Sequence, residues 1–453
     1  MSVAQTRAAA QTTLIAGGEA VLPTLLQAAA QAGPVGAPNR ALWLALVPIF
    51  GRIAAPQSCS FLVTQLTCPD VVVRTALLTA LHQCGYQADA ATRPLLEAEL
   101  RAEIAHASWT LTHLVAIGEP APGPLLLLRT ALHADLAEQQ ARLLLWLALL
   151  YDSATLQRVR TALALTPGLR RTPTEEQRAY ALETLDLLLT KAVSKQLLLL
   201  LDDLPPAQQL KQLAGEATHT PLPLPRQLAA LITGDERWVA PWLKAVALYA
   251  IAHALPTVQH DPTLQAAVTG ATTAADPLVQ ETAAWVKLRL NNGAVDSRGG
   301  AGLLLTVEKV LILQRVEIFA AMPATILVEI AAHLQEQFTP AGAIIFRQGA
   351  PGESIYFIVT GAVEALDGER VFTQMGEGEI FGEMALLDGE PRTATIRTTA
   401  PTHLLSLDQA PFYELMDEHI AMARGVIAVL AQRLRARTAD LSRLQAQVAA
   451  ISK

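Results

Sequence analysis

The most informative segment of the chain reads Phe381-Gly382-Glu383-Met384-Ala385-Leu386-Leu387-Asp388-Gly389-Glu390-Pro391-Arg392-Thr393-Ala394-Thr395. Gly382 has no side chain, so the backbone there can approach a ligand closely. A short helical turn beginning near Met384 would point free N–H groups outward, and such a helix start attracts anions. Arg392 offers a planar, permanently charged group that suits two phosphate oxygens. An ionised Glu383 only accepts hydrogen bonds, so beside a phosphate it must face a donor such as a ribose hydroxyl.

The residues on both sides of this segment predict a compact antiparallel β-roll. Between Phe338 and Val363, short runs rich in Ile, Val, Phe and Tyr are separated by Gly342, Gly349, Gly352 and Gly361. This punctuation is typical of short strands joined by tight turns. Asp367-Gly368 is typical of a hairpin turn between two strands. Residues 402–407 are expected to form a closing strand, and residues 410–448 a helix.

Taken together, these patterns resemble the cyclic nucleotide-binding domain of cAMP receptor proteins, of the regulatory subunit of cAMP-dependent kinase and of gated channels. The resemblance runs in one register over about residues 305–440. It implies that the ligand is cAMP or cGMP and that the residues binding this nucleotide are Phe381, Gly382, Glu383, Met384, Ala385, Leu386, Arg392 and Thr393. A β-roll that keeps the shape without the ligand is the alternative.

The resemblance also implies a C-terminal helix that folds over the base. Arg437 and Thr438 lie where base-capping residues of the family fall. A solvated or partner-facing arginine stripe is the alternative interpretation of this helix. Thr393 does not decide the base, since a hydroxyl at this position occurs in binders of both nucleotides, and we favour cAMP.

The first 292 residues are dominated by Leu and Ala with helical spacing. Residues 68–81, with Asp70 at the start of the helix and Arg74 one turn later, resemble the second helix of a HEAT repeat. Residues 275–288 repeat that outline, with Gln280 in place of the arginine. HEAT-type repeats run about 40–47 residues, so about six or seven would fit. We therefore predict a HEAT-like α-solenoid, with an irregular helical bundle as the alternative.

The predicted organisation is multidomain. A HEAT-like helical array over residues 1–292 is followed by a Gly- and Asn-rich linker over 293–302 and a nucleotide-binding domain over 303–453. Within that domain we expect helices over 303–336, a jelly-roll-like β-roll over 337–409 and C-terminal helices over 410–450.

Composition restricts the classes of partner. The net charge of −7 and the pI of about 5.8 give little support for sequence-independent binding to nucleic acid. The longest uncharged runs are about half of the ~20 residues that a membrane-spanning helix needs. The N-terminus shows no signal-peptide pattern, so we expect a cytoplasmic protein, free or peripheral on the cytoplasmic face of the membrane.

The residue types that usually carry catalysis or metal binding show no recognisable pattern. Cys59, Cys68 and Cys84 lack the Cys-x-x-Cys spacing and are expected to be small buried hydrophobic residues. His106 and His113 share a helical face with Glu103, an arrangement in which a metal site is conceivable. We prefer the interpretation that both are histidines of the core or of the helix surface. No nucleophile elbow, P-loop or kinase signature is present. We expect neither catalytic residues nor a metal or cofactor.

The combination predicts a non-enzymatic cyclic nucleotide sensor that signals to a protein partner through the HEAT-like array. After the closing strand at residues 402–407 we expect only helix, hence no DNA-binding domain. Residues 306–311 and 238–252, with the two HEAT-like helices, resemble the cytosolic tail of bacterial transporters related to ATP:ADP antiporters of the major facilitator class. That resemblance implies a stand-alone relative of such a tail, a truncated copy, or a subunit that docks on a membrane transporter. The alternatives are a scaffold whose nucleotide domain is ligand-free and a regulator of an enzyme on another chain.

Overall fold

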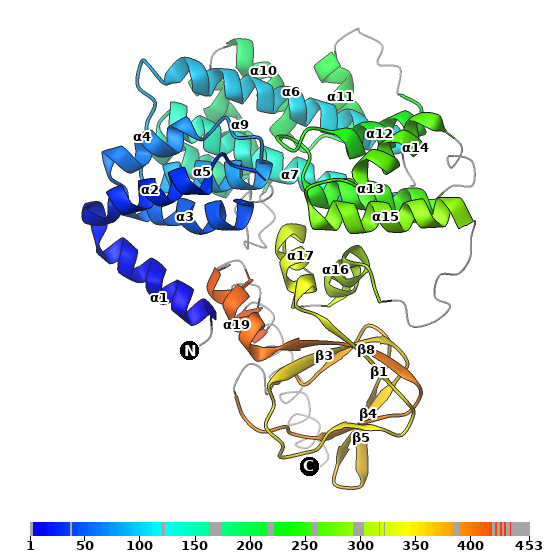
Figure 1. Cartoon of the computed structure of the whole chain (residues 1–453). Helices are drawn as coiled ribbons and strands as arrows, with labels where there is room; N and C mark the ends of the chain where they lie inside the picture. The colour runs from blue at the N-terminus through cyan, green and yellow to red at the C-terminus, as the bar shows by residue number, and fades with distance from the viewer. Residues whose placement is uncertain are drawn as a thin grey trace, which may run out of the picture. The chain divides into compact units, whose positions relative to one another are not determined.

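Figure 1 shows the computed structural model of the chain. It describes residues 3–36, 39–118, 123–163, 174–189, 191–214, 222–254, 261–292, 303–316, 318–320, 322–384 and 389–418, together with residues 422, 423, 426, 427, 430, 431 and 435. The chain divides into two compact units, residues 7–299 and residues 300–453, and the first six residues are grouped with the second. Each unit is described by itself. The predicted linker over 293–302 lies outside the described residues.

The described part of the first unit is entirely helical. In chain order its helices are α1 (Val3–Ala16), η1 (Gly18–Val21), α2 (Leu22–Ala32), α3 (Arg40–Ile53), α4 (Pro56–Thr64), α5 (Val71–Gln83), α6 (Arg93–Ile117), α7 (Pro124–Leu150), α8 (Ser153–Ala162), α9 (Glu175–Leu188), α10 (Lys191–Leu201), α11 (Pro206–Ala214), α12 (Leu224–Thr233), α13 (Pro241–Ala254), α14 (Pro262–Ala271) and α15 (Pro277–Asn292).

Several of these helices begin at an aspartate whose side chain accepts hydrogen bonds from the first free N–H groups. Asp70 accepts from the amides of Val72 and Val73 at 3.0 and 3.1 Å and starts α5. Asp276 accepts from the amide of Leu278 at 3.0 Å and starts α15. Such caps typically stabilise a helix by about 1 kcal/mol. The predicted helix starts at these two aspartates are confirmed.

Helix α7 supplies much of the core of the helical unit. It packs against α5, α6, α8 and α13, and the side chains of residues 142–150 are all buried. Trp146 is completely enclosed. Several leucines of this stretch, such as Leu143 and Leu147, are also completely buried. Burying one leucine side chain contributes about 1.5–3 kcal/mol relative to leaving it exposed. This apolar centre holds the helices together.

Polar contacts join helices that are far apart in the sequence. Arg40 donates to Asp70 at 2.6 Å and to Asp276 at 2.7 Å, so it bridges the starts of α5 and α15. Arg74 donates to the main-chain oxygen of Arg237 at 2.6 Å. A linear repeat stack needs contacts only between neighbouring repeats, whereas these bonds connect residues 163 and 236 positions apart. The solenoid prediction is not confirmed.

The described helices can be compared with the length and hydropathy that a membrane-spanning helix needs. No single helix among them is both long and apolar enough to cross a bilayer, although a sharply bent pair over residues 10–16 and 18–32 passes that test jointly.

The second unit combines helices with two four-stranded antiparallel sheets. Its elements are α16 (Thr306–Arg315), α17 (Ala324–Ala332), β1 (Gln335–Thr339), β2 (Ile344–Phe346), β3 (Ser354–Thr360), β4 (Val363–Asp367), β5 (Arg370–Met375), β6 (Ile380–Phe381), β7 (Thr395–Thr398), β8 (Thr402–Asp408) and α19 (Gln409–Glu418). The strand orders are β1-β8-β3-β6 and β2-β7-β4-β5.

The two sheets enclose one apolar core, as expected of a β-roll. Val363, Ile396 and Leu404 are among its buried members, and Phe346 and Tyr356 pack against it. Strands β4 and β5 pair antiparallel with Asp367 opposite Arg370, which confirms the hairpin turn predicted at Asp367-Gly368. In this core the fold brings β2, β3 and β6 close to the turn before β7.

Candidate functional site

The site begins at Gly382, directly after the short strand β6. Phe381 pairs with Tyr356 of β3, which fixes the position of the next residue. Gly382 has a φ of +81°, a backbone conformation that residues with a side chain rarely adopt. A Cβ atom on residue 382 would clash with Nη1 of Arg392 and would lie 3.1 Å from the main-chain oxygen of Ser354. Only glycine fits this position without displacing its neighbours.

The main chain of Arg392 is held by the turn that follows β2. Its N–H donates to the carbonyl of Ala350 at 2.8 Å, and its own carbonyl accepts from the N–H of Gly349 at 2.8 Å. These two bonds fix the point from which the long side chain departs. The guanidinium is thereby aimed at β3 and β6.

The guanidinium of Arg392 is bound by neutral acceptors and an aromatic ring. Nη1 donates to the carbonyl of Gly382 at 3.0 Å, and Nη2 donates to the carbonyl of Ser354 at 2.8 Å. Its Cζ lies 4.1 Å from the ring centroid of Phe346, within the range of a cation–π contact. These contacts orient the group without neutralising its charge.

Arg392 is a buried cation without a counter-charge in the described part of the chain. The residue is 5% exposed, and no described carboxylate forms an ion pair with it. Its Nε has no hydrogen-bond partner among the described residues. Burial lowers the pKa of the guanidinium. Because a buried charge is costly unless it is paired, the geometry suits an anion that would approach this group.

The other described residues of the predicted cassette fall into two classes. Phe381 is 3% exposed and stacks on Tyr356 with ring centroids 5.1 Å apart, so its side chain belongs to the core of the roll. Glu383 is half-buried and follows Gly382 directly, while Met384 is 53% exposed. Thr393 is exposed beside Arg392. Glu383 and Thr393 are therefore the polar cassette residues nearest in sequence to Gly382 and Arg392.

Four predicted site residues lie outside the described part of the chain. They are Ala385, Leu386, Arg437 and Thr438. Glu383 and Met384 are helical, while the rest of the helical turn predicted to begin near Met384 and most of the predicted C-terminal helix lie outside the described residues.

Three residues that hold Arg392 were not predicted. Ser354 supplies a backbone oxygen from β3, and Phe346 and Tyr356 supply ring faces at 4.1 and 5.9 Å from Cζ. Ser354 lies 38 residues before Arg392 in the chain. No local sequence pattern marks these three positions as contacts of an arginine. An apolar or small residue in a β-roll has the same pattern whether or not it touches a charged group.

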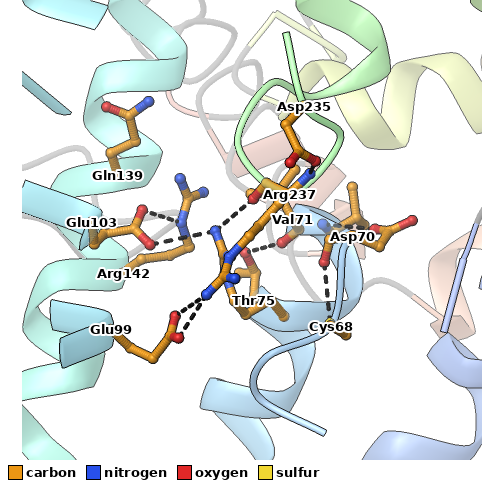
Figure 2. A network of polar contacts seen from close by, with 12 residues as sticks. Cys68, Asp70, Val71, Thr75, Glu99, Glu103, Gln139, Arg142, Asp235 and Arg237 are labelled. Atoms are coloured by element: carbon orange, nitrogen blue, oxygen red, sulfur yellow. Dashed lines mark hydrogen bonds and ion pairs between the residues drawn. The ribbon is translucent and has the colours of Figure 1, made fainter. Parts of the chain in front are cut away.

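Figure 2 shows a second polar cluster, which lies inside the helical unit. Glu103, fully buried, accepts from Nε of Arg142 at 2.9 Å and lies 3.6 Å from Nη2 of Arg74. Glu99 pairs with Arg237, with the closest oxygen 2.5 Å from Nη2. These ion pairs tie α5, α6 and α7 to the segment before α13.

The histidines and cysteines singled out in the sequence occupy packed positions. His106 stacks on Trp109 and packs at a tilt against Trp238, and burial lowers the pKa of His106 to about 4. Nδ1 of His113 lies 3.0 Å from the carbonyl of Trp109. Cys68 is buried, whereas Cys59 and Cys84 are only half-buried, which corrects the expectation for those two. The described residues contain no group of three or more His, Cys, Asp or Glu side chains that could hold a metal ion.

Comparisons with known proteins point to the β-roll. Residues 336–419 match the family model of the cyclic nucleotide-binding domain. A cyclic nucleotide-gated potassium channel of Mesorhizobium japonicum is 42% identical over 100 residues, which cover 22% of this chain and 28% of the channel. A CRP-like cAMP-activated global transcriptional regulator of Mycobacterium tuberculosis is 30% identical over 138 residues, which cover 29% of this chain and 62% of the regulator.

A solved structure matches over the same share of the chain. The catabolite activator protein of Thermus thermophilus is 30% identical and has a TM-score of 0.27, with 29% of this chain and 63% of that chain covered. The chain thus spans less than two thirds of each of these relatives. The family match supports a cyclic nucleotide-binding domain at residues 336–419.

Proposed function

We propose that the chain is a non-enzymatic cyclic nucleotide sensor whose β-roll binds cAMP or cGMP. One observation carries the proposal. The buried guanidinium of Arg392 has no carboxylate partner among the described residues and lies against Gly382, in a domain that matches the cyclic nucleotide-binding family. An arginine held in this way is suited to a cyclic phosphate, which bears one negative charge and two free oxygens.

Binding would exchange neutral acceptors for a charged one. In the structure Arg392 donates to the backbone carbonyls of Gly382 and Ser354. A phosphate within reach would accept from the same Nη atoms, and hydrogen bonds between two charged groups are about twice as strong as neutral ones. The difference favours the bound state and could reorganise the backbone at residue 382.

The remaining cassette residues complete the proposed binding mode. The carboxylate of Glu383 would accept the ribose 2′-hydroxyl, and the hydroxyl of Thr393 would lie beside the phosphate. These residues do not distinguish adenine from guanine, and we favour cAMP over cGMP. Arg437 and Thr438, on the C-terminal helix, would cap the base.

The output of the sensor is assigned to protein contacts. We place the partner surface on the helical unit, and a membrane transporter is the partner that the sequence resemblance suggests. The protein is placed in the cytoplasm or on the cytoplasmic face of the membrane.

The C-terminal helix would convert nucleotide binding into a conformational change, which hydrogen exchange can follow. Slower exchange over residues 421–445 on adding nucleotide is expected, together with slower exchange over 382–393.

The test of binding is calorimetric melting of the full chain with cAMP, cGMP or 5′-AMP. A ligand at a hundred times its dissociation constant stabilises the folded form by about 2.7 kcal/mol if it binds that form alone. We expect the melting temperature to rise with a cyclic nucleotide and to rise much less with 5′-AMP. A protein that ignores both cyclic nucleotides would instead be a scaffold with a ligand-free nucleotide domain.

A further inference from the structure

The helical unit contains a pocket that is separate from the β-roll. It lies among α12, α13 and α14 and the start of α15, and its volume is about 690 Å³. Sites for small molecules usually have about 300–1,000 Å³. The pocket is therefore large enough for a small organic ligand, and its walls come entirely from the unit of residues 7–299.

The walls of the pocket are built mainly from small apolar residues. Members from α12, α14 and α15 include Ala229, Ala266, Ala267, Gly270, Ala271 and Val279. Small side chains leave space between packed helices, and an apolar lining favours a hydrocarbon group over a polar one. These features alone do not identify a ligand.

The distinctive member of the lining is Lys244, from the first turn of α13. The residue is 8% exposed and lines the pocket. Its side chain makes no hydrogen bond or ion pair with any residue that the structure describes. Burial lowers the pKa of Lys244, which is the expected effect when an ammonium loses water without gaining a partner.

The charged groups around Lys244 explain why it stays unpaired. Asp276 is engaged by Arg40 and by the start of α15, and Asp235 accepts from the N–H of Arg237 at 2.9 Å. Glu236 is half-buried, lines the same pocket and favours the charged form of Lys244 from beyond ion-pair distance. The ammonium is thus available to an anion that enters the pocket.

We propose that this pocket binds a small monocarboxylate with an apolar body, whose carboxylate pairs with Lys244. The alanine, glycine and valine walls would receive the hydrocarbon part. Of the charged residues that line the pocket, Lys244 is buried, Glu236 is half-buried and Arg226 is exposed. A monocarboxylate matches the one buried cation of this lining, and Glu236 would repel a second negative charge. The proposal does not depend on nucleotide binding by the β-roll.

The experiment is titration calorimetry of the full chain with sodium octanoate below its micellar concentration. We expect saturable binding of one octanoate per chain. The uncharged probe 1-octanol and inorganic phosphate should bind at least about tenfold more weakly, since each lacks one of the two features that the pocket recognises. A phosphate that bound as tightly as octanoate would overturn the assignment to a carboxylate.

Two variants and a control make the assignment specific. Lys244→Met keeps the length of the side chain and should weaken octanoate binding about tenfold to hundredfold, the usual effect of losing a charge-assisted hydrogen bond. Lys211→Met removes an exposed charge from α11, outside the pocket, and should bind octanoate like the unaltered protein. Equal binding by Lys244→Met and the unaltered chain would disprove the role of Lys244.

The second variant, Gly270→Leu, fills the pocket without disturbing the helix. Gly270 lines the pocket, and a Cβ built on it meets no atom within 4 Å. Leucine also has a higher helix propensity than glycine, so the variant should melt no lower than the unaltered protein while binding octanoate less well. Lys244→Met should likewise melt no lower, because it removes a buried charge that has no partner. Undiminished binding by Gly270→Leu, or no octanoate binding by the unaltered chain, would also overturn the proposal.

Discussion

The guanidinium of Arg392 occupies the space into which a side chain on Gly382 would project. Nη1 donates to the carbonyl of Gly382 itself at 3.0 Å, and a Cβ on residue 382 would clash with that nitrogen. Residue 382 also has a φ of +81°. The glycine and the arginine, ten residues apart, are thus in direct contact. A substitution of either residue should therefore alter the position of the other.

Gly382→Ala is expected to destabilise the β-roll. The left-handed backbone costs a residue with a side chain about 1–2 kcal/mol, and the clash with Arg392 adds to that. Calorimetry of the full chain should show a lower melting temperature for the transition of the β-roll. Nucleotide affinity should fall as well, because the guanidinium would be displaced.

The coupling between the two residues can be measured with a double-mutant cycle. In a chain that already carries Arg392→Ala, the clash with the guanidinium is absent, while the backbone strain and the tight approach to the main-chain oxygen of Ser354 remain. Gly382→Ala should therefore cost less stability in that background than in the unaltered chain, by the 0.5–3 kcal/mol typical of residues in contact. Equal costs in both backgrounds would show that the contact has no energetic weight.

Arg392→Ala is expected to abolish most of the nucleotide affinity. Removing one member of a buried charged pair costs about 2–5 kcal/mol, or roughly 30- to several-thousand-fold in affinity. Arg392→Lys should also bind poorly, because an ammonium cannot reproduce the planar fork. Titration calorimetry with cAMP would measure both, with Arg370→Ala on the exposed face of β5 as the matched control. Near-native affinity of Arg392→Ala would exclude the proposed binding mode.

Glu383→Gln should weaken binding less than Arg392→Ala does. A hydrogen bond to a charged group contributes about 1.5–3 kcal/mol, and the amide keeps an oxygen that can still accept. The 2′-deoxy nucleotide provides an independent check on the ligand side. If the unaltered protein bound that analogue as tightly as the parent nucleotide, Glu383 would not contact the 2′-hydroxyl.

Glu103→Gln should strongly destabilise the helical unit. The carboxylate lies between Arg142 and Arg74, all three residues are buried, and breaking such a pair costs about 3–5 kcal/mol. The exposed pair of Arg93 and Glu97 is the control, since Glu97→Gln should cost less than about 1 kcal/mol. Urea unfolding followed by tryptophan fluorescence reads this unit selectively, because all six tryptophans lie between residues 43 and 285.

Asp135 should make the stability of the helical unit depend on pH. Burial raises the pKa of this carboxyl to about 7 in the folded protein, with Glu138 and Glu103 acting in the same direction against Arg142. In the unfolded chain it titrates near its ordinary value of about 4. Between about pH 4 and pH 7 the folded protein keeps a proton that the unfolded chain has released, so stability falls as pH rises through this window.

Asp135→Asn tests that dependence, because asparagine has no proton to release. The free energy of unfolding of the unaltered chain should fall relative to the variant by up to about 1.4 kcal/mol per pH unit in this window. The titration of His106 is common to both proteins and cancels in the comparison. A difference that stayed constant from pH 4.5 to pH 8 would show that Asp135 is ionised in the folded state.

The sequence by itself determined the local elements of this protein. Glycines and apolar runs marked the strands of the β-roll, Asp367-Gly368 marked a hairpin, and Asp70 and Asp276 marked the starts of α5 and α15. These features follow rules that act over a few residues, such as turn geometry and helix capping. The cassette was also recognisable, because its glycine and its arginine lie close together in the chain.

Only the tertiary structure decided which of these elements meet and which charges remain unpaired. Ser354, which accepts from Arg392, lies 38 residues before it, and Arg40 reaches Asp276 across 236 residues. The availability of Lys244 depends on how its acidic neighbours are oriented and engaged, which no local pattern encodes. Burial and pairing of a charge are properties of everything packed around it, so they emerge when distant segments come together in the fold.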